Sequence, residues 1–328
     1  MIKKIKAKLY SLFFWQSSLG EIFNKLYDLN IFLSNYFTTS SLKNKSAYQA
    51  FLTKQYHIVE KGLALPIPRK NFGIPKIKVL IEKAIFYRSK YGEDRIVRNI
   101  QEVLNQYLER NSELRKLNIE FYKMLVDFID SKKFDRHGGV KIVTVTEIKK
   151  AVNIDFKSFM QTRSSVRNFS SENNILEEEV YKAIEIAKYT PSVCNRQSWR
   201  VHYFDNRVMI DKLLKIQNGN NGFTESINKL LIVTTSTKYF TKLESNQVFV
   251  DGGMFAMSLV LALHSQSIAS CCLNTCLPYV DEKKIKIIGK IPKDERLIMM
   301  IGIGKYKEVF EVAISNRIPL EEIIRLKK

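Results

Sequence analysis

The sequence predicts an α+β fold, in which a mixed sheet and its helices surround a central buried helix, preceded by a mainly α-helical N-terminal domain. Three observations support this prediction. Apolar residues recur at helical spacing before residue 130, helical and strand patterns alternate after Asp155, and the segment Val248 to His264 is apolar on nearly every side. A segment that is apolar all round is typical of a helix buried in a core.

The N-terminal part predicts helices because its apolar residues repeat at intervals of three and four. One such helix face carries Ile100, Val103, Leu104, Tyr107 and Leu108. The stretch from Gly62 to Pro75 contains three prolines and two glycines, which predicts a loop between helices. Residues 131–154 are polar and lack a clear period, so they predict a linker between an extension of unknown role at 1–150 and a second domain at 151–328.

The second domain predicts both helices and strands. The segment Leu176 to Tyr189 is expected to be a helix, with the acidic triplet at Glu177 to Glu179 near its positive N-terminal end. Alternating or short apolar runs predict strands at Trp199 to Phe204, Leu230 to Thr235 and Leu297 to Ile303. This order of elements indicates a sheet that packs against a core helix.

The charge of the chain is strongly positive and unevenly distributed. The formal net charge is +20, and residues 1–150 hold 28 Lys and Arg against 14 Asp and Glu. Such an excess is typical of proteins that meet nucleic acid, an anionic membrane or a phosphate-bearing ligand, and it also occurs in lysine-rich proteomes. No nucleic-acid motif accompanies the charge, so we expect no nucleic-acid partner.

The cysteines indicate a reducing compartment. Cys194, Cys271, Cys272 and Cys276 are few and are not spaced as a disulfide framework, which predicts a cytoplasmic protein with free thiols. Their spacing contains no C-x-x-C pair and no histidine at finger distance, so we expect no metal site.

The apolar segments of the sequence predict neither an export signal nor a membrane span. The basic N-terminus leads into an apolar run that stops at Gln16 without a small-residue cleavage site. The apolar segment Met254 to Leu263 is shorter than the ~18 residues that a span requires.

Two polar segments carry the chemistry of the second domain. The first runs from Arg163 to Phe169 and brackets Ser164 and Ser165 between Arg163 and Arg167. Guanidinium groups bind phosphate in a bidentate manner and hydroxyls add neutral donors, so this segment predicts a phosphate site. The second runs from Thr190 to Trp199, where Asn195 and Gln197 offer both donors and acceptors.

The order and separation of these segments resemble the FMN-dependent nitroreductase family. The family pattern is R-x-S-x-R-x-F, a helix, and then P-S-x-x-N-x-Q-x-W entering a strand. It continues with an apolar helix, a small-residue segment, a strand with a Gly-rich end and a late Arg-Xaa-Pro. The later parts are matched by Asp251 to His264, Ser267 to Asn274, Ile301 to Lys305 and Arg317 to Pro319.

The resemblance implies a flavin site and its residues. Arg163, Ser164, Ser165 and Arg167 would hold the phosphate and ribityl chain of FMN, with Arg317 reaching the same phosphate. The resemblance also implies that the flavin ring is lined from a partner subunit in a homodimer, and that the backbone at one further pair of residues donates to the reactive ring nitrogen. The ring-lining residues would be Pro191, Ser192, Asn195 and Gln197, and the backbone pair would be Leu273 and Asn274.

The chain departs from the family pattern in places. Cys272 stands where a tryptophan is common, and Ser267 and Ala269 replace two glycines. The segments Gln217 to Asn228 and Lys238 to Gln247 are expected to form the variable substrate wall. The flavin performs the chemistry, so no catalytic side chain is predicted, and His264 is expected to be a hydrogen-bonded core histidine.

Two functional hypotheses follow. The first is an oxidoreductase that passes hydride from NAD(P)H through FMN to an unidentified acceptor. The E-K-G-L segment at Glu60 to Leu63 resembles longer members of the family associated with polysaccharide biosynthesis. The second is a docking module with little activity, whose amphipathic opening at Ile2 to Phe37 contacts a membrane surface or a partner through Phe13, Phe14 and Trp15.

Overall fold

The computed structural model describes residues 14, 17–38, 40–65, 69–129, 138–151, 153–171, 175–315 and 317–327. Of the aromatic residues proposed as membrane anchors, Phe13 and Trp15 lie outside this part of the chain, while Phe14 is exposed. The helices before residue 130 are α2 (Ser18–Asn35), α3 (Lys45–Leu63), α4 (Ile74–Tyr91), α5 (Arg95–Arg110), α6 (Leu114–Leu117) and α7 (Ile119–Phe128).

The remaining elements alternate between helix and strand. The helices are α8 (Val145–Ala151), α9 (Phe156–Thr162), α10 (Glu177–Ala187), α11 (Arg207–Leu214), α12 (Gln247–Ser265), α13 (Tyr279–Ile288) and α14 (Leu320–Ile323). The strands are β1 (Trp199–Phe204), β2 (Lys229–Ser236), β3 (Ile268–Leu273) and β4 (Glu295–Lys305). Short 3₁₀ turns form η2 (Val193–Asn195), η3 (Thr224–Ser226), η4 (Thr237–Tyr239) and η5 (Lys242–Glu244).

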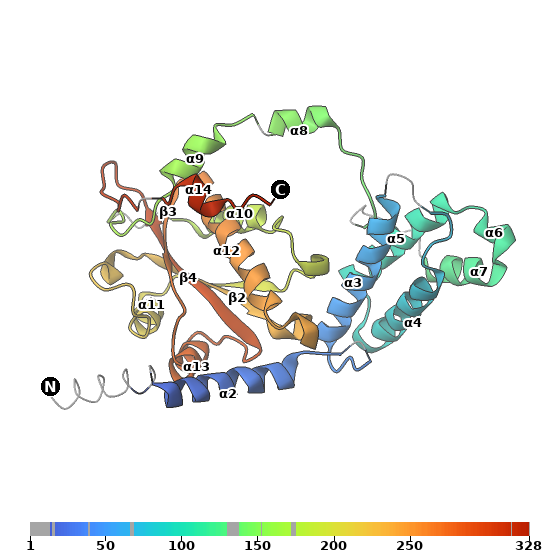
Figure 1. Cartoon of the computed structure of the whole chain (residues 1–328), viewed down its shortest axis with the longest axis horizontal. Helices are drawn as coiled ribbons and strands as arrows, with labels where there is room; N and C mark the ends of the chain where they lie inside the picture. The colour runs from blue at the N-terminus through green and yellow to red at the C-terminus, as the bar shows by residue number, and fades with distance from the viewer. Residues whose placement is uncertain are drawn as a thin grey trace.

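Helices α3, α4, α5 and α7 form a separate helical body with its own core (Figure 1). Side chains of Asn44, Asp94 and Asn118 cap the N-termini of α3, α5 and α7, which satisfies backbone donors that a helix leaves free. The predicted helix face is confirmed: Ile100, Val103, Leu104 and Tyr107 are buried, and Leu108 packs partly against them.

The predicted loop and linker are both tied to this helical body. At Gly62 a Cβ atom would stand 2.3 Å from the ring of Phe72, so glycine there allows the loop to fold back onto α3. Within the predicted linker, the backbone N–H groups of Gly138 and Gly139 donate to the carboxylates of Glu102 and Glu60. Glu60 thus anchors the linker to α3.

The sheet has the order β1-β2-β4-β3 and every pair of these strands is antiparallel. The predicted α+β class is confirmed, but the expectation of mixed pairing is not: parallel pairing is limited to isolated bridges such as Ser165–Ser270. All three predicted strands are present, and β3 adds an edge strand at Ile268–Leu273.

Helix α12 lies across one face of the sheet (Figure 1). At Gly252 a Cβ atom would stand 2.5 Å from the Thr235 Oγ1 and 2.6 Å from Ile298, so glycine sets the close approach of helix and sheet. By length and composition α12 is the one helix of the described residues that could cross a membrane. Its packing against α10 and the sheet matches the core helix of a folded domain.

The prediction that α12 is buried on nearly every side is wrong in one respect. One face of the helix is exposed in the single chain, with about two fifths to one half of each apolar side chain accessible. The residues on this face are Phe249, Val250, Met254 and Met257. We call them the α12 stripe.

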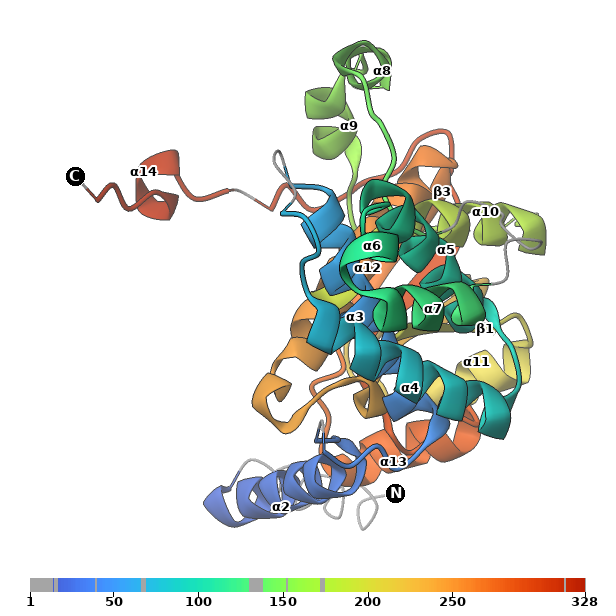
Figure 2. The ribbon, with the colours of Figure 1, turned by 90° about the vertical axis from the view of Figure 1, so that its right-hand side faces the viewer.

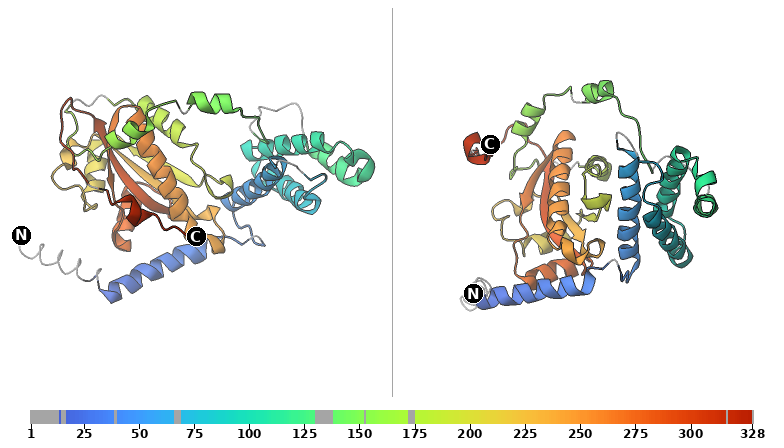
Figure 3. Two further views of the ribbon diagram at one scale, coloured as in Figure 1. Left: turned by 45° about the horizontal axis from the view of Figure 1, so that its top comes forward. Right: turned by 45° about the vertical axis from the view of Figure 1, so that its right-hand side comes forward.

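Helix α2 runs along α13, away from the other N-terminal helices (Figures 1 and 2). The guanidinium of Arg296 pairs with Asp28 at 2.8 Å, and the rings of Tyr27 and Tyr279 pack with centroids 5.3 Å apart. The division of the chain at residue 150 stays a prediction, and α2 contacts elements from beyond it. After β4 the chain leaves the body as an arm that ends in α14 (Figures 2 and 3).

Candidate functional site

The predicted phosphate segment lies beside β3. Ser165 forms a parallel bridge with Ser270, and the Val166 N–H donates to the Ser270 carbonyl at 2.9 Å. Phe169 is buried against Gly304, where a Cβ atom would stand 2.6 Å from the ring. The aromatic residue of the motif therefore anchors the segment to β4, and glycine in the Gly-rich strand end makes room for it.

Arg163 and Arg167 flank this segment with free guanidinium groups. Among the described residues neither arginine forms an ion pair with a carboxylate. Ser164 and Ser165 between them are partly exposed. Two unpaired cations with neighbouring hydroxyl donors form a site that is suited to a phosphate group.

His264 links this end of α12 to its neighbours. Its Nε2 lies 3.1 Å from the Thr162 hydroxyl, and its Nδ1 lies 2.9 Å from the Tyr306 hydroxyl. Burial, and then the charge of Arg163, lower the pKa of His264, so the neutral ring is favoured. The prediction of a hydrogen-bonded histidine is confirmed.

Two cysteines of β3, Cys271 and Cys272, have raised pKa values, which favours the thiol over the thiolate. Burial raises the pKa of Cys271, although the charge of Arg167 opposes the shift. Desolvation, with the neighbouring Cys271, also raises the pKa of Cys272, although its side chain is exposed in the single chain. Nucleophilic cysteines need the thiolate, so these two residues are poor candidates for covalent chemistry. In the described ranges no cluster of three or more metal-ligating side chains is present.

One part of the predicted substrate wall joins the phosphate segment to Asn274 at the end of β3. The segment 217–228 contacts Asn274 at one end, where Gln217 Nε2 donates to the Asn274 carbonyl at 3.2 Å. At the other end the Ser226 hydroxyl donates to the Arg167 carbonyl at 3.4 Å. Asn274 follows directly on Leu273 at the end of β3, so the phosphate segment and the Leu273–Asn274 backbone lie along one strand.

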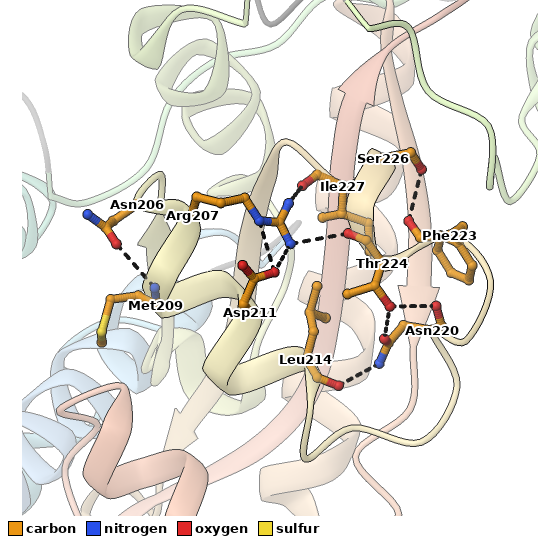
Figure 4. A network of polar contacts seen from close by, with 10 residues as sticks. All are labelled: Asn206, Arg207, Met209, Asp211, Leu214, Asn220, Phe223, Thr224, Ser226 and Ile227. Carbon is orange, nitrogen blue, oxygen red and sulfur yellow. Dashed lines mark hydrogen bonds and ion pairs between the residues drawn. The ribbon is translucent and has the colours of Figure 1, made fainter.

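Arg207 holds that wall segment in place (Figure 4). Its guanidinium donates to the carbonyl of Ile227 at 2.6 Å and to that of Thr224 at 3.3 Å, and it pairs with Asp211. Asn220 is buried and donates to the Leu214 carbonyl at 2.8 Å. These side chains satisfy backbone groups of the segment, most of which lies outside regular secondary structure.

The predicted ring-lining loop at 191–197 follows α10. Ser192 Oγ accepts from the Gln197 N–H at 3.0 Å, and Gln197 Nε2 donates to the Asn195 side-chain oxygen at 3.1 Å. Three residues of this loop, Cys194, Asn195 and Gln197, have φ between 50° and 53°. Non-glycine residues in this left-handed region are uncommon, so surrounding contacts must hold the loop in shape.

Three residues that the sequence analysis did not single out supply those contacts. The Asp251 carboxylate accepts from the Val193 N–H at 3.2 Å. Arg196 has a fully buried side chain and pairs with Glu244 at 2.9 Å. The sequence contained one signal for these contacts. Asp251 is a charged residue inside an apolar helix, and such a residue usually has a buried partner.

The candidate residues fall into separate groups within one chain. Trp199, which follows the ring-lining loop, pairs through Thr235 with Arg296, whereas Ser270 beside the phosphate segment pairs with Ile303. The separation of Arg296 and Ile303 along β4 corresponds to roughly 23 Å at the rise of an extended strand. A single chain therefore keeps Pro191, Ser192, Asn195 and Gln197 away from Arg163 and Arg167.

Arg317 is not brought to the phosphate segment in the single chain. It is exposed in the C-terminal arm, and its guanidinium donates to the Ser315 carbonyl of the same arm. For Arg317 to bind the flavin phosphate as predicted, the arm would have to reach a phosphate segment other than the one in its own chain.

Comparisons with known proteins place the match over the second domain. The profile of the nitroreductase family matches residues 160–305. The Bacillus subtilis protein YdgI, provisionally named as an NAD(P)H nitroreductase, is 23% identical over 53% of this chain and 98% of its own length.

Two solved structures are similar to part of this chain. A provisional NADH dehydrogenase/NAD(P)H nitroreductase from Parabacteroides distasonis is 19% identical with a TM-score of 0.47, over 54% of this chain and 100% of that one. An FMN-dependent nitroreductase from Clostridium difficile is 18% identical with a TM-score of 0.41, over 47% of this chain and 90% of that one.

The pair Arg196–Glu244 makes the stability of the ring-lining loop testable. We expect Glu244→Gln to lower the free energy of unfolding by about 3 kcal/mol, because it leaves a buried guanidinium without its counter-ion. Lys54→Gln is the matched control, since Lys54 is 4.0 Å from Glu244 and partly exposed, and it should cost less than about 1 kcal/mol. Urea unfolding of the three proteins measures both effects, and equal losses would contradict the assignment.

The same pair predicts a pH dependence. Burial opposes ionisation of Glu244, but bonds from Arg196 and Thr241 outweigh it and lower its pKa below the usual 4.5. A lowered folded pKa gives stability that is present above 4.5 and is lost as pH falls through the folded value. The difference between wild type and Glu244→Gln should therefore shrink in acid.

Proposed function

We propose, from the match of residues 160–305 to the nitroreductase family, that the protein is an FMN-dependent oxidoreductase that passes hydride from NAD(P)H to a second acceptor. The observation that carries the proposal is the pair of unpaired arginines, Arg163 and Arg167, beside Ser165 and β3 within the matched region. The relatives support it through their names, which include an NAD(P)H nitroreductase and an FMN-dependent nitroreductase.

The residues of the site fit FMN in chemistry. Arg163 and Arg167 would hold the dianionic phosphate, with hydroxyl donors from Ser164 and Ser165. The backbone at Leu273 and Asn274 would border the reactive edge of the ring. When bound, FMN accepts a hydride from the reductant and returns it to the acceptor, so the protein needs to position the reactants and exclude water.

The wall segment 217–228 supports this task. It is tied at one end to the Asn274 carbonyl and at the other to the Arg167 carbonyl. Its anchoring by Arg207 therefore sets the distance between the phosphate-binding and ring-bordering parts of the site. Precise spacing of this kind is the main contribution of a protein to cofactor chemistry.

We further propose that the protein acts as a homodimer. A second copy would bring its Pro191, Ser192, Asn195 and Gln197 to the flavin, since these residues lie at the far end of the sheet in their own chain. The exposed α12 stripe supplies an apolar surface for such a contact, because contiguous apolar patches on a folded domain usually mark interfaces. The C-terminal arm that carries Arg317 is exposed and could reach the partner.

The acceptor is proposed on resemblance alone. The E-K-G-L segment at Glu60 to Leu63 suggests a step in polysaccharide biosynthesis, on a sugar or a sugar-linked intermediate. Within α3, Glu60 and Gly62 have architectural roles, because Glu60 anchors the linker and Gly62 admits Phe72. The cytoplasmic location stays a prediction from the cysteines.

Helix α2 favours peripheral membrane contact as a second function. One side of the helix packs toward α13, and another side carries an apolar face with about 42% to 55% of each side chain exposed. The face consists of Leu19, Ile22, Phe23, Leu26, Leu29 and Leu33. An amphipathic helix next to a lysine-rich N-terminus suits an anionic lipid surface.

Flavin binding tests the main proposal. Arg163→Gln/Arg167→Gln should weaken FMN binding about 100-fold, since two charge-assisted contacts to phosphate are lost. Arg98→Gln/Arg115→Gln removes the same charge from exposed positions of the helical body and should leave binding unchanged. Flavin fluorescence titration gives the Kd values, followed by anaerobic NAD(P)H to bleach the bound flavin. Failure of the wild type to bind FMN would refute the proposal.

The dimer is tested by charging the α12 stripe. Met254→Lys/Met257→Lys should convert a dimer to a monomer in sedimentation velocity and release FMN, because the two parts of the site separate. Ile142→Lys/Val208→Lys places the same charges at exposed apolar positions outside the stripe and should remain dimeric. A monomeric wild type that retains FMN would rule out the shared site.

The membrane contact is tested with vesicles. Leu26→Glu/Leu33→Glu should weaken co-sedimentation with anionic vesicles at least about tenfold, because two apolar side chains are lost and two negative charges gained. Ile142→Glu/Val208→Glu carries the same charge change and serves as the control. Equal loss in both variants would indicate general electrostatic attraction and not docking through α2.

A further inference from the structure

A cavity of about 740 Å³ lies between α2 and α13. Figures 1 and 2 show these helices side by side, although they are far apart in the sequence. One wall comes from the N-terminal region and the other from the second domain. The size falls within the range of small-molecule sites. None of the predicted flavin residues lines this cavity.

The wall from α13 and the turn after it is rich in lysine. Lys283, Lys286, Lys290 and Lys293 all line the cavity. Lys286 is buried and pairs with Glu282 at 2.7 Å. The other three are exposed, and among the described residues none of them has a carboxylate partner.

The nearby carboxylates are engaged by other cations. Asp281 pairs with Lys284 at 2.7 Å, and Asp294 pairs with Lys238 at 2.9 Å. The cavity wall therefore has an excess of positive charge that its own segment does not neutralise. A cluster of ammonium groups with no counter-ion repels itself and is stabilised when an anion binds.

The opposite wall adds neutral and apolar groups. Helix α2 contributes the polar side chains of Asn30 and Ser34, together with the ring of Tyr27. The Lys283 ammonium stands 5.1 Å from the centroid of that ring, which holds one cation at the rim. Ile31 and Ile291, which are buried, give the cavity an apolar floor. This combination suits a ligand with a multiply charged head and an organic body.

We propose that this lysine pocket binds the phosphate group of a phosphate ester. Lysine binds phosphate as a point charge, and three unpaired lysines match a group of two or more negative charges better than a single carboxylate. The ester could be a soluble molecule or the headgroup of a lipid that lies beside the exposed face of α2. The pocket is separate from the flavin site, so its ligand does not depend on FMN.

The experiment measures pyrophosphate binding to the full-length, FMN-saturated protein by isothermal titration calorimetry. Saturation with FMN blocks the arginines of the flavin site. Lys290→Gln/Lys293→Gln should weaken pyrophosphate binding about tenfold or more, and Lys212→Gln/Lys215→Gln, which removes the same charge from exposed positions at α11, should not. Unchanged unfolding temperatures and FMN affinity would show that both variants are intact.

A second arm separates the two sources of phosphate. Vesicles of phosphatidylcholine with phosphatidic acid replace pyrophosphate, and pure phosphatidylcholine is the blank. Loss of pyrophosphate binding in the pocket variant supports a soluble ester, and loss confined to phosphatidic acid vesicles supports a lipid headgroup. The proposal is overturned if the wild type binds neither probe, or if both variants lose binding equally.

Discussion

Helix α12 connects the two halves of the candidate site, and its contact with the sheet determines where both lie. At its N-terminal end Gly252 lets the helix approach Thr235, and the adjacent Asp251 accepts from the backbone of the ring-lining loop. At its C-terminal end His264 contacts Thr162, directly before the phosphate segment. Since Asp251 and His264 are 13 residues apart on the helix, about 20 Å at the helical rise, these two groups are held far apart.

That separation is the basis of the proposal that a second chain completes the flavin site. The phosphate segment, β3 and the wall segment 217–228 form one continuous surface, tied together by contacts at Arg167 and Asn274. The ring-lining loop lies at the opposite end of β4. The exposed α12 stripe gives the dimer proposal a physical basis.

The N-terminal helices contact the second domain at specific residues. Helix α3 packs beside η2, and its Lys54 approaches the Glu244 that neutralises Arg196. Helix α2 lines the lysine pocket and exposes an apolar face. The helical extension thus contacts the elements around the ring-lining loop at one point and forms the lysine pocket and an exposed apolar face at another.

The sequence by itself determined the helix face in α5 and the positions of β1, β2 and β4, and it singled out the phosphate segment, because each depends on residues within a few positions of one another. Tertiary structure decided the antiparallel pairing, the exposed face of α12 and the separation of Arg167 from Asn195. It also decided the partners of Asp251 and Arg196, which lie about fifty positions away along the chain. Periodicity and motifs report local preferences, whereas buried charge pairs and helix-to-sheet contacts join distant segments that only folding brings together.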